Sequence, residues 1–331
     1  MYTDSYLMEK RGTDTLILAT LLYIAMQLAA AVLLLFAGDG VAVQIVISAV
    51  CVSGVAILFP ALLAIVRGGA KRYGLLWPGW GVVLLSAAAG VGIFMFSTGI
   101  NAFAMTAMEA LGANPDIYAQ QIPAAATVWE TVFYIAMLAL VPAVCEELLF
   151  RSVYVNSWRG MGRWKVVLVT SAIFALAHMT PASIVSFFVI GAVLGLLTYE
   201  TRSVYPAMII HFINNTISIW LSSASFDSAQ AEAIDNVSTT QLGAVLLAAG
   251  ALVAVPALYA TFRLAKRARS GAQASPDAEG APAVHGDAAL EELREQLTQA
   301  NRRRTRRVIA VVMAAMALLN ALVFALAFVQ L

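Results

Sequence analysis

Ionisable and amide side chains interrupt three apolar stretches of this chain, at positions where they could form a reactive site. These side chains are Glu146, Glu147 and Arg151 in the first stretch, His178 in the second, and His211 with Asn215 in the third. Placing a charged side chain at the centre of a lipid bilayer costs about 2.5–3.5 kcal/mol or more. We therefore interpret the three clusters as a functional polar site, and not only as interhelical hydrogen-bonding residues.

Helical spacing indicates how these residues are arranged. Glu147 and Arg151 are four residues apart and share one face of a helix, where they can form an ion pair. Glu146 points about 100° away from Glu147 and is free to face the interior of a bundle. His211 and Asn215 are also one turn apart, so an imidazole and a carboxamide can address one point. The pattern predicts a polar catalytic cavity inside a helical bundle.

The side-chain types suit hydrolysis of an amide bond by an activated water. The sequence contains no GxSxG and no HExxH motif, so it gives little support to a serine nucleophile or a conventional zinc protease helix. Glu146 in a low-dielectric pocket can act as general base toward water, with His178 sharing the proton. His211 and Asn215 can donate hydrogen bonds to an oxyanion, which contributes about 3–4 kcal/mol per donor.

A metal-dependent version of the same chemistry is also open. Glu146, His178 and His211 make a three-ligand set with a free fourth position, as in a catalytic zinc site. A bound zinc would then activate the water. The residue types do not separate the two mechanisms. We favour a site that requires no cofactor and keep zinc, held by these three residues, as the alternative.

The composition assigns these residues to a membrane protein. Of the 331 residues, 61% are hydrophobic and 12% are charged, whereas soluble domains have about half and about a quarter. A spanning helix needs about 20 mainly apolar residues. Nine stretches meet this requirement, at residues 15–37, 41–66, 81–105, 128–157, 160–179, 182–199, 204–222, 241–263 and 308–330. The sequence therefore predicts an all-α, polytopic membrane bundle with about nine transmembrane helices.

Basic residues occur before the first of these stretches and in every second connection after it. They are Lys10, Arg11, Arg67, Lys71, Arg72, Arg159, Arg163, Lys165, Arg202, Arg263, Lys266, Arg267 and Arg269. Because short cytoplasmic loops are enriched in Lys and Arg, this alternation predicts a cytoplasmic amino terminus and a carboxyl terminus on the outer face. The formal net charge of only +1 argues against a nucleic-acid partner.

The chain divides into three parts by composition. Residues 1–265 form the predicted helical bundle, with the polar motifs in its core at 128–220. Residues 266–307 are expected to be a cytoplasmic linker followed by a short amphipathic basic helix, with Asp287 as N-cap. Residues 308–331 are expected to form an additional transmembrane helix. We interpret the arginines before it as an anchor to anionic lipid, and the C-terminal part could support oligomerisation. These arginines are Arg302, Arg303, Arg304, Arg306 and Arg307.

Three motifs in a fixed order carry a resemblance to a known family. Glu146 to Arg151 reads EELLFR and matches EExxxR, Phe174 to His178 matches FxxxH, and His211 to Asn215 matches HxxxN. This ordered trio resembles the CPBP family of intramembrane proteases, also called the CAAX protease and bacteriocin-processing or Abi family, which includes the Ras-converting prenyl endopeptidase. The likeness covers residues 128 to 220.

The resemblance implies an all-helical fold with a cavity open to the cytoplasm and a glutamate-dependent endopeptidase activity. It implies catalytic roles for Glu146, His178, His211 and Asn215, completed by the pair Glu147 and Arg151. Members of the family have been described both as metalloproteases and as metal-independent glutamate proteases, so the metal stays open. We expect a membrane-associated peptide or protein substrate, prenylated or not. We also expect the chain to be a multi-pass protein of a bacterial or archaeal plasma membrane.

Two other classes of function remain open at this point. A proton- or cation-coupled transporter could use Glu146, His178 and His211 as a relay, and would need a path to both faces of the membrane. A catalytically silent immunity or chaperone protein could carry the same motifs, because fold and residues alone do not demonstrate turnover.

Overall fold

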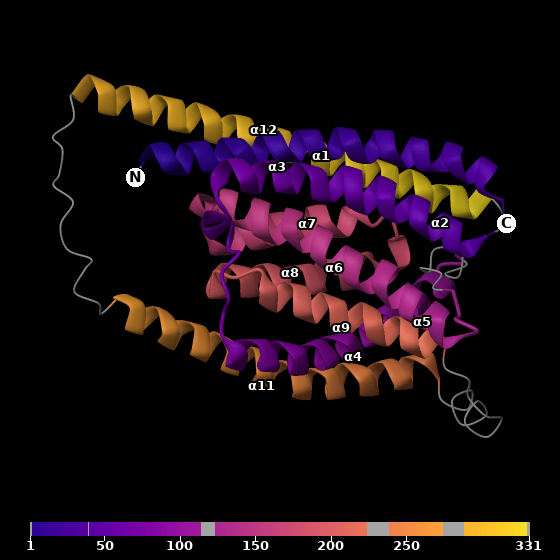
Figure 1. The fold of residues 1–331 in the computed structure, drawn as a ribbon. Helices are drawn as coiled ribbons and strands as arrows, with labels where there is room; N and C mark the ends of the chain where they lie inside the picture. Colours follow the sequence, from indigo (N-terminus) through magenta and orange to yellow (C-terminus); the bar gives the residue numbers. More distant parts are fainter. Residues whose placement is uncertain (1, 39, 114–122, 224–237, 274–287, 330–331) are drawn as a thin grey trace.

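The chain folds into a bundle of antiparallel helices (Figure 1). The computed structural model describes residues 2–38, 40–113, 123–223, 238–273 and 288–329. Within these ranges every regular element is a helix, which confirms the predicted all-α class. The elements in chain order are α1 (Tyr2–Ala37), α2 (Val41–Ser48), η1 (Ala49–Leu58), α3 (Phe59–Gly68), η2 (Ala70–Tyr73), α4 (Trp80–Ala110), α5 (Val128–Tyr134), η4 (Ile135–Leu140), α6 (Val141–Glu146), η5 (Glu147–Val155), η6 (Arg159–Met161), α7 (Arg163–Ala177), η7 (Pro181–Ser183), α8 (Ile184–Thr201), α9 (Tyr205–Ser222), α11 (Thr239–Gln273) and α12 (Ala288–Val329).

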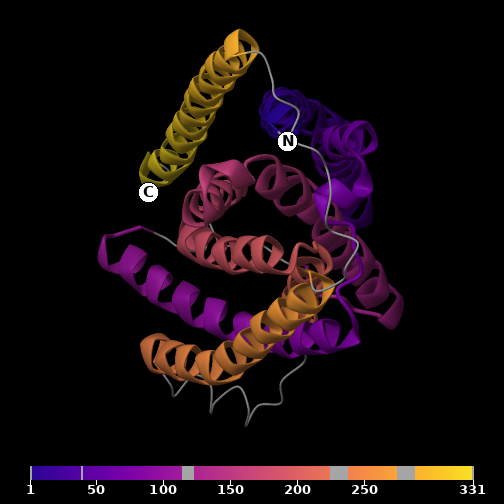
Figure 2. The same ribbon diagram turned by 90° about the vertical axis from the view of Figure 1, so that its left-hand side faces the viewer.

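The elements that carry the polar motifs lie in the middle of the bundle. Figure 1 shows α1, α2, α3 and α12 on one side, α4 and α11 on the other, and α6 to α9 between them. The turned view in Figure 2 shows α12 beside α1 and α7 and away from α4 and α11, in agreement with its contacts to α1 and α7. The inner helices are therefore shielded by protein on two sides.

Among the described residues, seven helical segments are long and apolar enough to cross a membrane. They are Ser5–Ala37, Val41–Gly68, Trp80–Ala110, Val128–Val155, Pro181–Thr201, Thr239–Arg267 and Glu295–Leu322. The expected spans 160–179 and 204–222 correspond to α7 and α9, which are not among them. The reason is that α7 has only 15 residues and α9 carries His211, Asn214 and Asn215. The polytopic bundle is confirmed, whereas the predicted count of nine is not.

The basic connections gather at one end of the bundle. The α3–α4 and α8–α9 connections meet where the Val204 amide donates to the Gly74 carbonyl at 3.0 Å. Ser152, near the end of η5, donates to the Tyr73 carbonyl of η2 at 2.6 Å. At the start of α7, Arg163 pairs with Glu200 of α8 at 3.2 Å. Figure 1 shows the amino terminus at this same end. We call it the basic end.

Two proline residues coincide with changes in helix type. Pro60 follows the π-helix η1 and Pro142 follows the π-helix η4. Proline has no N–H, and its ring clashes with the carbonyl four residues earlier, so the wider π turn gives the chain room to continue. Helical spacing alone predicted a regular helix over 128–157, which differs from the observed succession of α5, η4, α6 and η5.

Glycine lets α4 and α11 approach closely on the outer side of the bundle. A Cβ atom added to Gly92 would lie 2.8 Å from the Gly250 carbonyl oxygen, and one added to Gly99 would lie 2.7 Å from the Gly243 carbonyl oxygen. In both helices the paired glycines are seven residues apart, which is two helical turns on one face. Small residues at such crossings stabilise helix association in membranes by allowing close van der Waals packing, because the hydrophobic effect does not drive helices together within lipid.

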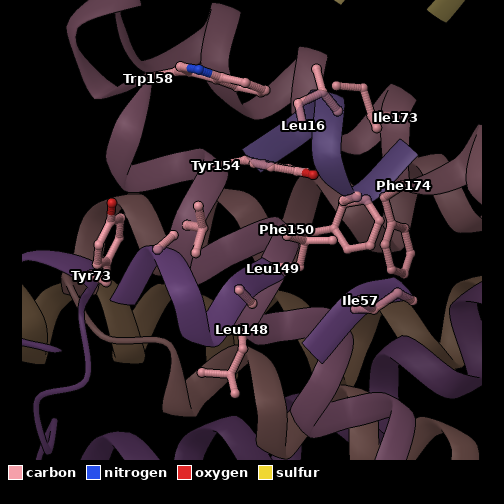
Figure 3. Packing of buried hydrophobic residues seen from close by; sticks show 14 of the residues in the cluster. Leu16, Ile57, Tyr73, Leu148, Leu149, Phe150, Tyr154, Trp158, Ile173 and Phe174 are labelled. Carbon is pink, nitrogen blue, oxygen red and sulfur yellow. The ribbon is translucent and has the colours of Figure 1, made fainter. Parts of the chain in front are cut away.

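Aromatic packing fixes η5 against its neighbours. Tyr154 stacks on Trp158 with ring centroids 5.0 Å apart, and Phe150 contacts Phe174 of α7 edge to face at 5.2 Å. Figure 3 shows these rings in one cluster with Leu16 of α1 and other apolar side chains. Because all of these side chains are buried, the helix that begins at Glu147 has little freedom to rotate.

The C-terminal part differs from the expected division at 307/308. The basic segment and the last apolar segment form one continuous helix, α12, because residues 288–329 contain no glycine or proline to end it. Helix α11 also continues to Gln273, past the expected start of the linker at 266. The expected N-cap Asp287 and the rest of the linker, 274–287, lie outside the described residues.

Polar contacts join α12 to α1 near the basic end. The hydroxyls of Thr13 and Thr305 hydrogen bond at 2.8 Å, and both residues are fully buried. Arg304 donates to Asp14 at 2.8 Å, and Arg302 lies 3.9 Å from Glu9. Two of the five clustered arginines therefore pair with acidic residues of α1.

Candidate active site

Glu147 is the centre of a buried charged group. Its Oε1 atom accepts hydrogen bonds from Arg151 NH1 at 2.9 Å and from His211 Nδ1 at 2.8 Å. Glu147 and Arg151 are 0% and 1% exposed, so the pair expected from their spacing is present and completely removed from solvent. The guanidinium also lies 4.0 Å from the centre of the Phe174 ring, a cation–π contact. Arg151 thus balances the buried charge on Glu147.

The contact with Glu147 orients the His211 ring. A carboxylate only accepts hydrogen bonds, so His211 carries its proton on Nδ1 and leaves the lone pair of Nε2 free. Nε2 lies 4.0 Å from Glu146 Oε2. Sequence spacing missed this link, because Glu147 and His211 are 64 residues apart and only the fold brings them together.

His178 reaches the same point from a different local structure. Helix α7 ends at Ala177, so His178 lies directly after the helix. The expected span 160–179 had placed it within the helix. Its Nδ1 donates to the Phe174 carbonyl at 2.8 Å, which leaves Nε2 free, 3.8 Å from Glu146 Oε2. The ring stacks on Phe187 of α8 at 4.0 Å. Phe187 therefore fixes the plane of the imidazole, a role that no sequence motif indicated.

Glu146 is the residue on which both histidines converge. Its side chain is 14% exposed, and Oε2 is buried without a hydrogen-bond partner among the described residues. Separations of 3.8 and 4.0 Å to the two Nε2 atoms are too long for direct hydrogen bonds. A water molecule between Glu146 Oε2 and one of the two Nε2 atoms could donate a hydrogen bond of about 2.8 Å to each of them. The arrangement can therefore hold and deprotonate a water molecule.

Asn215 lies on the same cavity wall as His211, as their spacing predicted. Its Nδ2 donates to the Leu138 carbonyl at 3.4 Å, and its Oδ1 accepts from Asn214 Nδ2 at 3.2 Å. Leu138 is four residues before Pro142, which has no N–H to offer that carbonyl. The proline in the spanning segment thus leaves a backbone acceptor for Asn215, a sequence signal that could have been recognised.

The four expected catalytic side chains line one cavity of about 430 Å³. On the opposite wall α4 and α8 contribute further polar groups, which the sequence reading did not assign. Ser186 donates to Asn101 Oδ1 at 2.6 Å, and Ser97 donates to Asn214 Oδ1 at 3.4 Å. A second cavity of about 300 Å³, between α1, η1, α7 and α12, is also lined by Glu146 and His178. The two residues therefore lie between two cavities.

The larger cavity extends from the site away from the basic end. Its lining includes Ile45 in α2, Met105 in α4, Pro123 before α5 and Ser218 in α9. These residues lie near the ends of their helices that are remote from the basic connections. The cavity extends in this direction because His178, one of its lining residues, follows the last residue of α7, and α7 begins at the basic end with Arg163.

The types of the three donor groups suit a metal ion, but the distances between their ligand atoms are too long for one. Two imidazole Nε2 atoms, each oriented by a hydrogen bond at Nδ1, and one carboxylate oxygen are ordinary zinc ligands. In a tetrahedral site with bonds of about 2.0–2.1 Å the ligand atoms would be about 3.4 Å apart, against the observed 3.8 and 4.0 Å. Across the described ranges, no group of three or more His, Cys, Asp or Glu is arranged to hold a metal ion.

Fold and site together define a helical membrane protein with a buried glutamate–histidine cluster inside its bundle. Residues 128–217 match the Rce1-like family, described as type II CAAX prenyl endopeptidase Rce1-like. This match supports the CPBP or CAAX protease family for the segment, and the four expected catalytic residues lie within it. The match covers well under half of the chain and leaves out α1 to α4, α11 and α12. No curated protein and no solved structure was found to match the chain.

Proposed function

We propose that this protein is an intramembrane endopeptidase of the CAAX type that hydrolyses a peptide bond of a membrane-associated substrate. The observation that carries the proposal is the convergence of Glu146 Oε2 with the Nε2 atoms of His178 and His211 at 3.8 and 4.0 Å, inside a cavity of the bundle. The match of residues 128–217 to a protease family supports the same conclusion.

In the proposed reaction Glu146 accepts a proton from a water molecule as the water oxygen attacks the peptide carbonyl carbon. His178 shares that proton through Nε2 and passes it to the leaving nitrogen when the C–N bond breaks. The products are a carboxylate and an amine, so no other reactant is needed. Phe187 and the Phe174 carbonyl hold the His178 ring in the orientation this transfer requires.

His211 and Asn215 stabilise the oxyanion in this proposal. Glu147 accepts from His211 Nδ1 and fixes the orientation of the ring, and Arg151 balances the negative charge on that carboxylate. A protonated Nε2 can then donate to the oxyanion, together with Asn215 Nδ2. The Nδ2 of Asn215 donates only a long bond of 3.4 Å to Leu138, so this donor can turn toward a substrate at little cost.

A metal ion remains an alternative way to activate the water. Glu146, His178 and His211 would hold it after a contraction of about 0.5 Å in their spacing. A bound zinc would supply Lewis-acid activation of the water. We propose the metal-free mechanism, because the Glu146 carboxylate already supplies a base and the His178 imidazole supplies a proton relay.

The test is cleavage of a fluorescence-quenched CAAX peptide, farnesylated or not, by the purified protein in detergent. We expect cleavage by the wild type, a loss of 10²-fold or more in kcat for Glu146→Gln, and no effect of a strong chelator. Glu109→Gln, which changes an exposed carboxylate of α4, is the matched control. Wild-type activity in Glu146→Gln would remove that residue from the mechanism, and loss of activity with chelator would assign the water to a metal.

Coupled transport is the second candidate, and it is favoured by one observation. Glu146 and His178 line two cavities, as a relay between the two faces of a membrane would require. Transport predicts proton or cation flux in liposomes that depends on Glu146, without peptide cleavage. Flux without cleavage would replace the protease proposal.

A further inference from the structure

The turn that carries His178 is held by side chains from outside the matched segment. We define the His178 turn as residues 177–180. Helix α7 ends here, and the last carbonyls of a helix have no N–H partner within the helix. The Ala177 carbonyl accepts from the Tyr23 hydroxyl of α1 at 2.6 Å, and the Leu176 carbonyl accepts from Asn320 Nδ2 of α12 at 2.9 Å. Two distant helices thus satisfy the two carbonyls directly before His178.

The backbone of the His178 turn is strained, and its own backbone hydrogen bonds are long. Met179 has a φ of 52°, in the left-handed region, and is not a glycine. The Met179 amide lies 3.4 Å from the Leu176 carbonyl, at the long limit of a hydrogen bond. A strained turn of this kind persists only where its surroundings determine it. Tyr23 and Asn320 are the side chains that do so from outside α7.

Asn320 is an unusual residue at its position. It is 6% exposed in the apolar half of α12, and it lies one turn from Met316, which lines the 300 Å³ cavity together with Glu146 and His178. Its amide nitrogen also donates to the Met316 carbonyl at 2.8 Å. Asn320 therefore binds, from a helix outside the matched segment, the backbone two residues before His178.

We propose that Tyr23 and Asn320 are positioning residues that hold His178 Nε2 in reach of Glu146. The inference rests on the proposed peptidase function and adds α1 and α12 to the active site. The Nε2 to Oε2 distance of 3.8 Å allows one bridging water, and a displacement of about 1 Å in a catalytic group costs up to 10²-fold in rate. The C-terminal helix is therefore part of the catalytic unit in this proposal.

The first experiment measures kcat and KM for Tyr23→Phe, Asn320→Leu and the double variant. Each substitution keeps the shape of the side chain and removes its hydrogen bond. We expect kcat to fall severalfold in the single variants and by up to about 10²-fold in the double variant, with KM changed less than about twofold. Asn320→Gln, which retains an amide donor, should recover part of kcat. Thr20→Val is the matched control, because Thr20 lines the same cavity but donates only to Leu16 of its own helix.

The second experiment follows the imidazole itself and does not depend on turnover. The chain has three histidines, so nitrogen NMR of histidine-labelled protein in detergent gives a small set of signals, which His178→Gln assigns. We expect the wild-type signal of His178 to report a proton fixed on Nδ1, and the double variant to show averaging between the two nitrogens. The His211 signal should stay unchanged.

The outcomes separate this inference from the proposed function. Unchanged kcat and an unchanged His178 signal in folded variants would overturn the positioning role. A shifted His178 signal in a protein whose wild type cleaves no peptide would support positioning and reject the peptidase. If Asn320→Leu fails to fold, Tyr23→Phe and Asn320→Gln still decide the matter, because they change one polar atom or one methylene.

Discussion

The inner helices and the outer helices of this bundle follow different rules. The inner segment from α5 to α9 contains two π-helices, a buried ion pair and a histidine after a helix end. The outer helices α1, α4, α11 and α12 are long, and their exposed side chains are mostly apolar. The difference shows that charged side chains are buried where protein covers them, because lipid cannot satisfy polar groups.

The largest stability effect is expected from the buried ion pair of the inner segment. Arg151→Ala leaves Glu147, which is 0% exposed, with only His211 as a partner, so the free energy of unfolding should fall by about 3–5 kcal/mol. Thermal unfolding in detergent, followed by tryptophan fluorescence, measures this. The double variant Glu147→Gln with Arg151→Met is the control, since it removes both charges and should recover most of the loss. A small effect of Arg151→Ala alone would mean that the inner segment does not depend on charge balance.

The outer helices should instead be sensitive to side-chain volume. Gly92→Leu places a side chain where α11 passes, 2.8 Å from the Gly250 carbonyl for the Cβ atom alone. We expect a loss of about 1–3 kcal/mol in the free energy of unfolding from overpacking. Gly81→Leu is the matched control, because on the same helix its Cβ would meet only the end of the Leu264 side chain at 3.2 Å. Equal losses in both variants would contradict the view that close backbone approach holds α4 to α11.

The sequence was sufficient to predict the motifs of the inner segment but not the contacts between residues that are far apart in the chain. Spacing predicted the Glu147–Arg151 pair because both residues are on one helix, and the all-α bundle followed from apolar run length. The bond between Glu147 and His211, 64 residues apart, depends on how helices pack, which no local pattern encodes. The same holds for Asn320 and Leu176, 144 residues apart. Only the presence of an amide side chain in the apolar half of the last span could have marked Asn320 beforehand.

Pro142 tests whether the irregular backbone of the inner segment serves the site. Pro142→Ala restores an N–H that can bond to the Leu138 carbonyl and compete with Asn215 Nδ2. We expect kcat to change by about threefold, with the free energy of unfolding equal or higher. Pro60→Ala is the control, because Pro60 has the same relation to η1 but no contact with Asn215. If both variants change kcat equally, the effect belongs to helix flexibility and not to the Leu138 carbonyl.

The smallest effect is expected at the basic end, where charge is exposed. Arg304 and Asp14 are 46% and 47% exposed in their 2.8 Å ion pair, so Arg304→Ala should lower the free energy of unfolding by no more than about 1 kcal/mol.

The buried hydroxyl pair of Thr13 and Thr305 provides the contrast within the same contact between α1 and α12. Thr305→Val leaves the Thr13 hydroxyl only its bond to the Glu9 carbonyl and should cost more than Arg304→Ala does. Added salt should reduce the Arg304→Ala effect and leave the Thr305→Val effect unchanged, because screening acts on exposed charges and not on a buried hydrogen bond between neutral groups. The reverse order of the two variants would mean that exposed charge, and not buried polar contact, joins the C-terminal helix to the bundle.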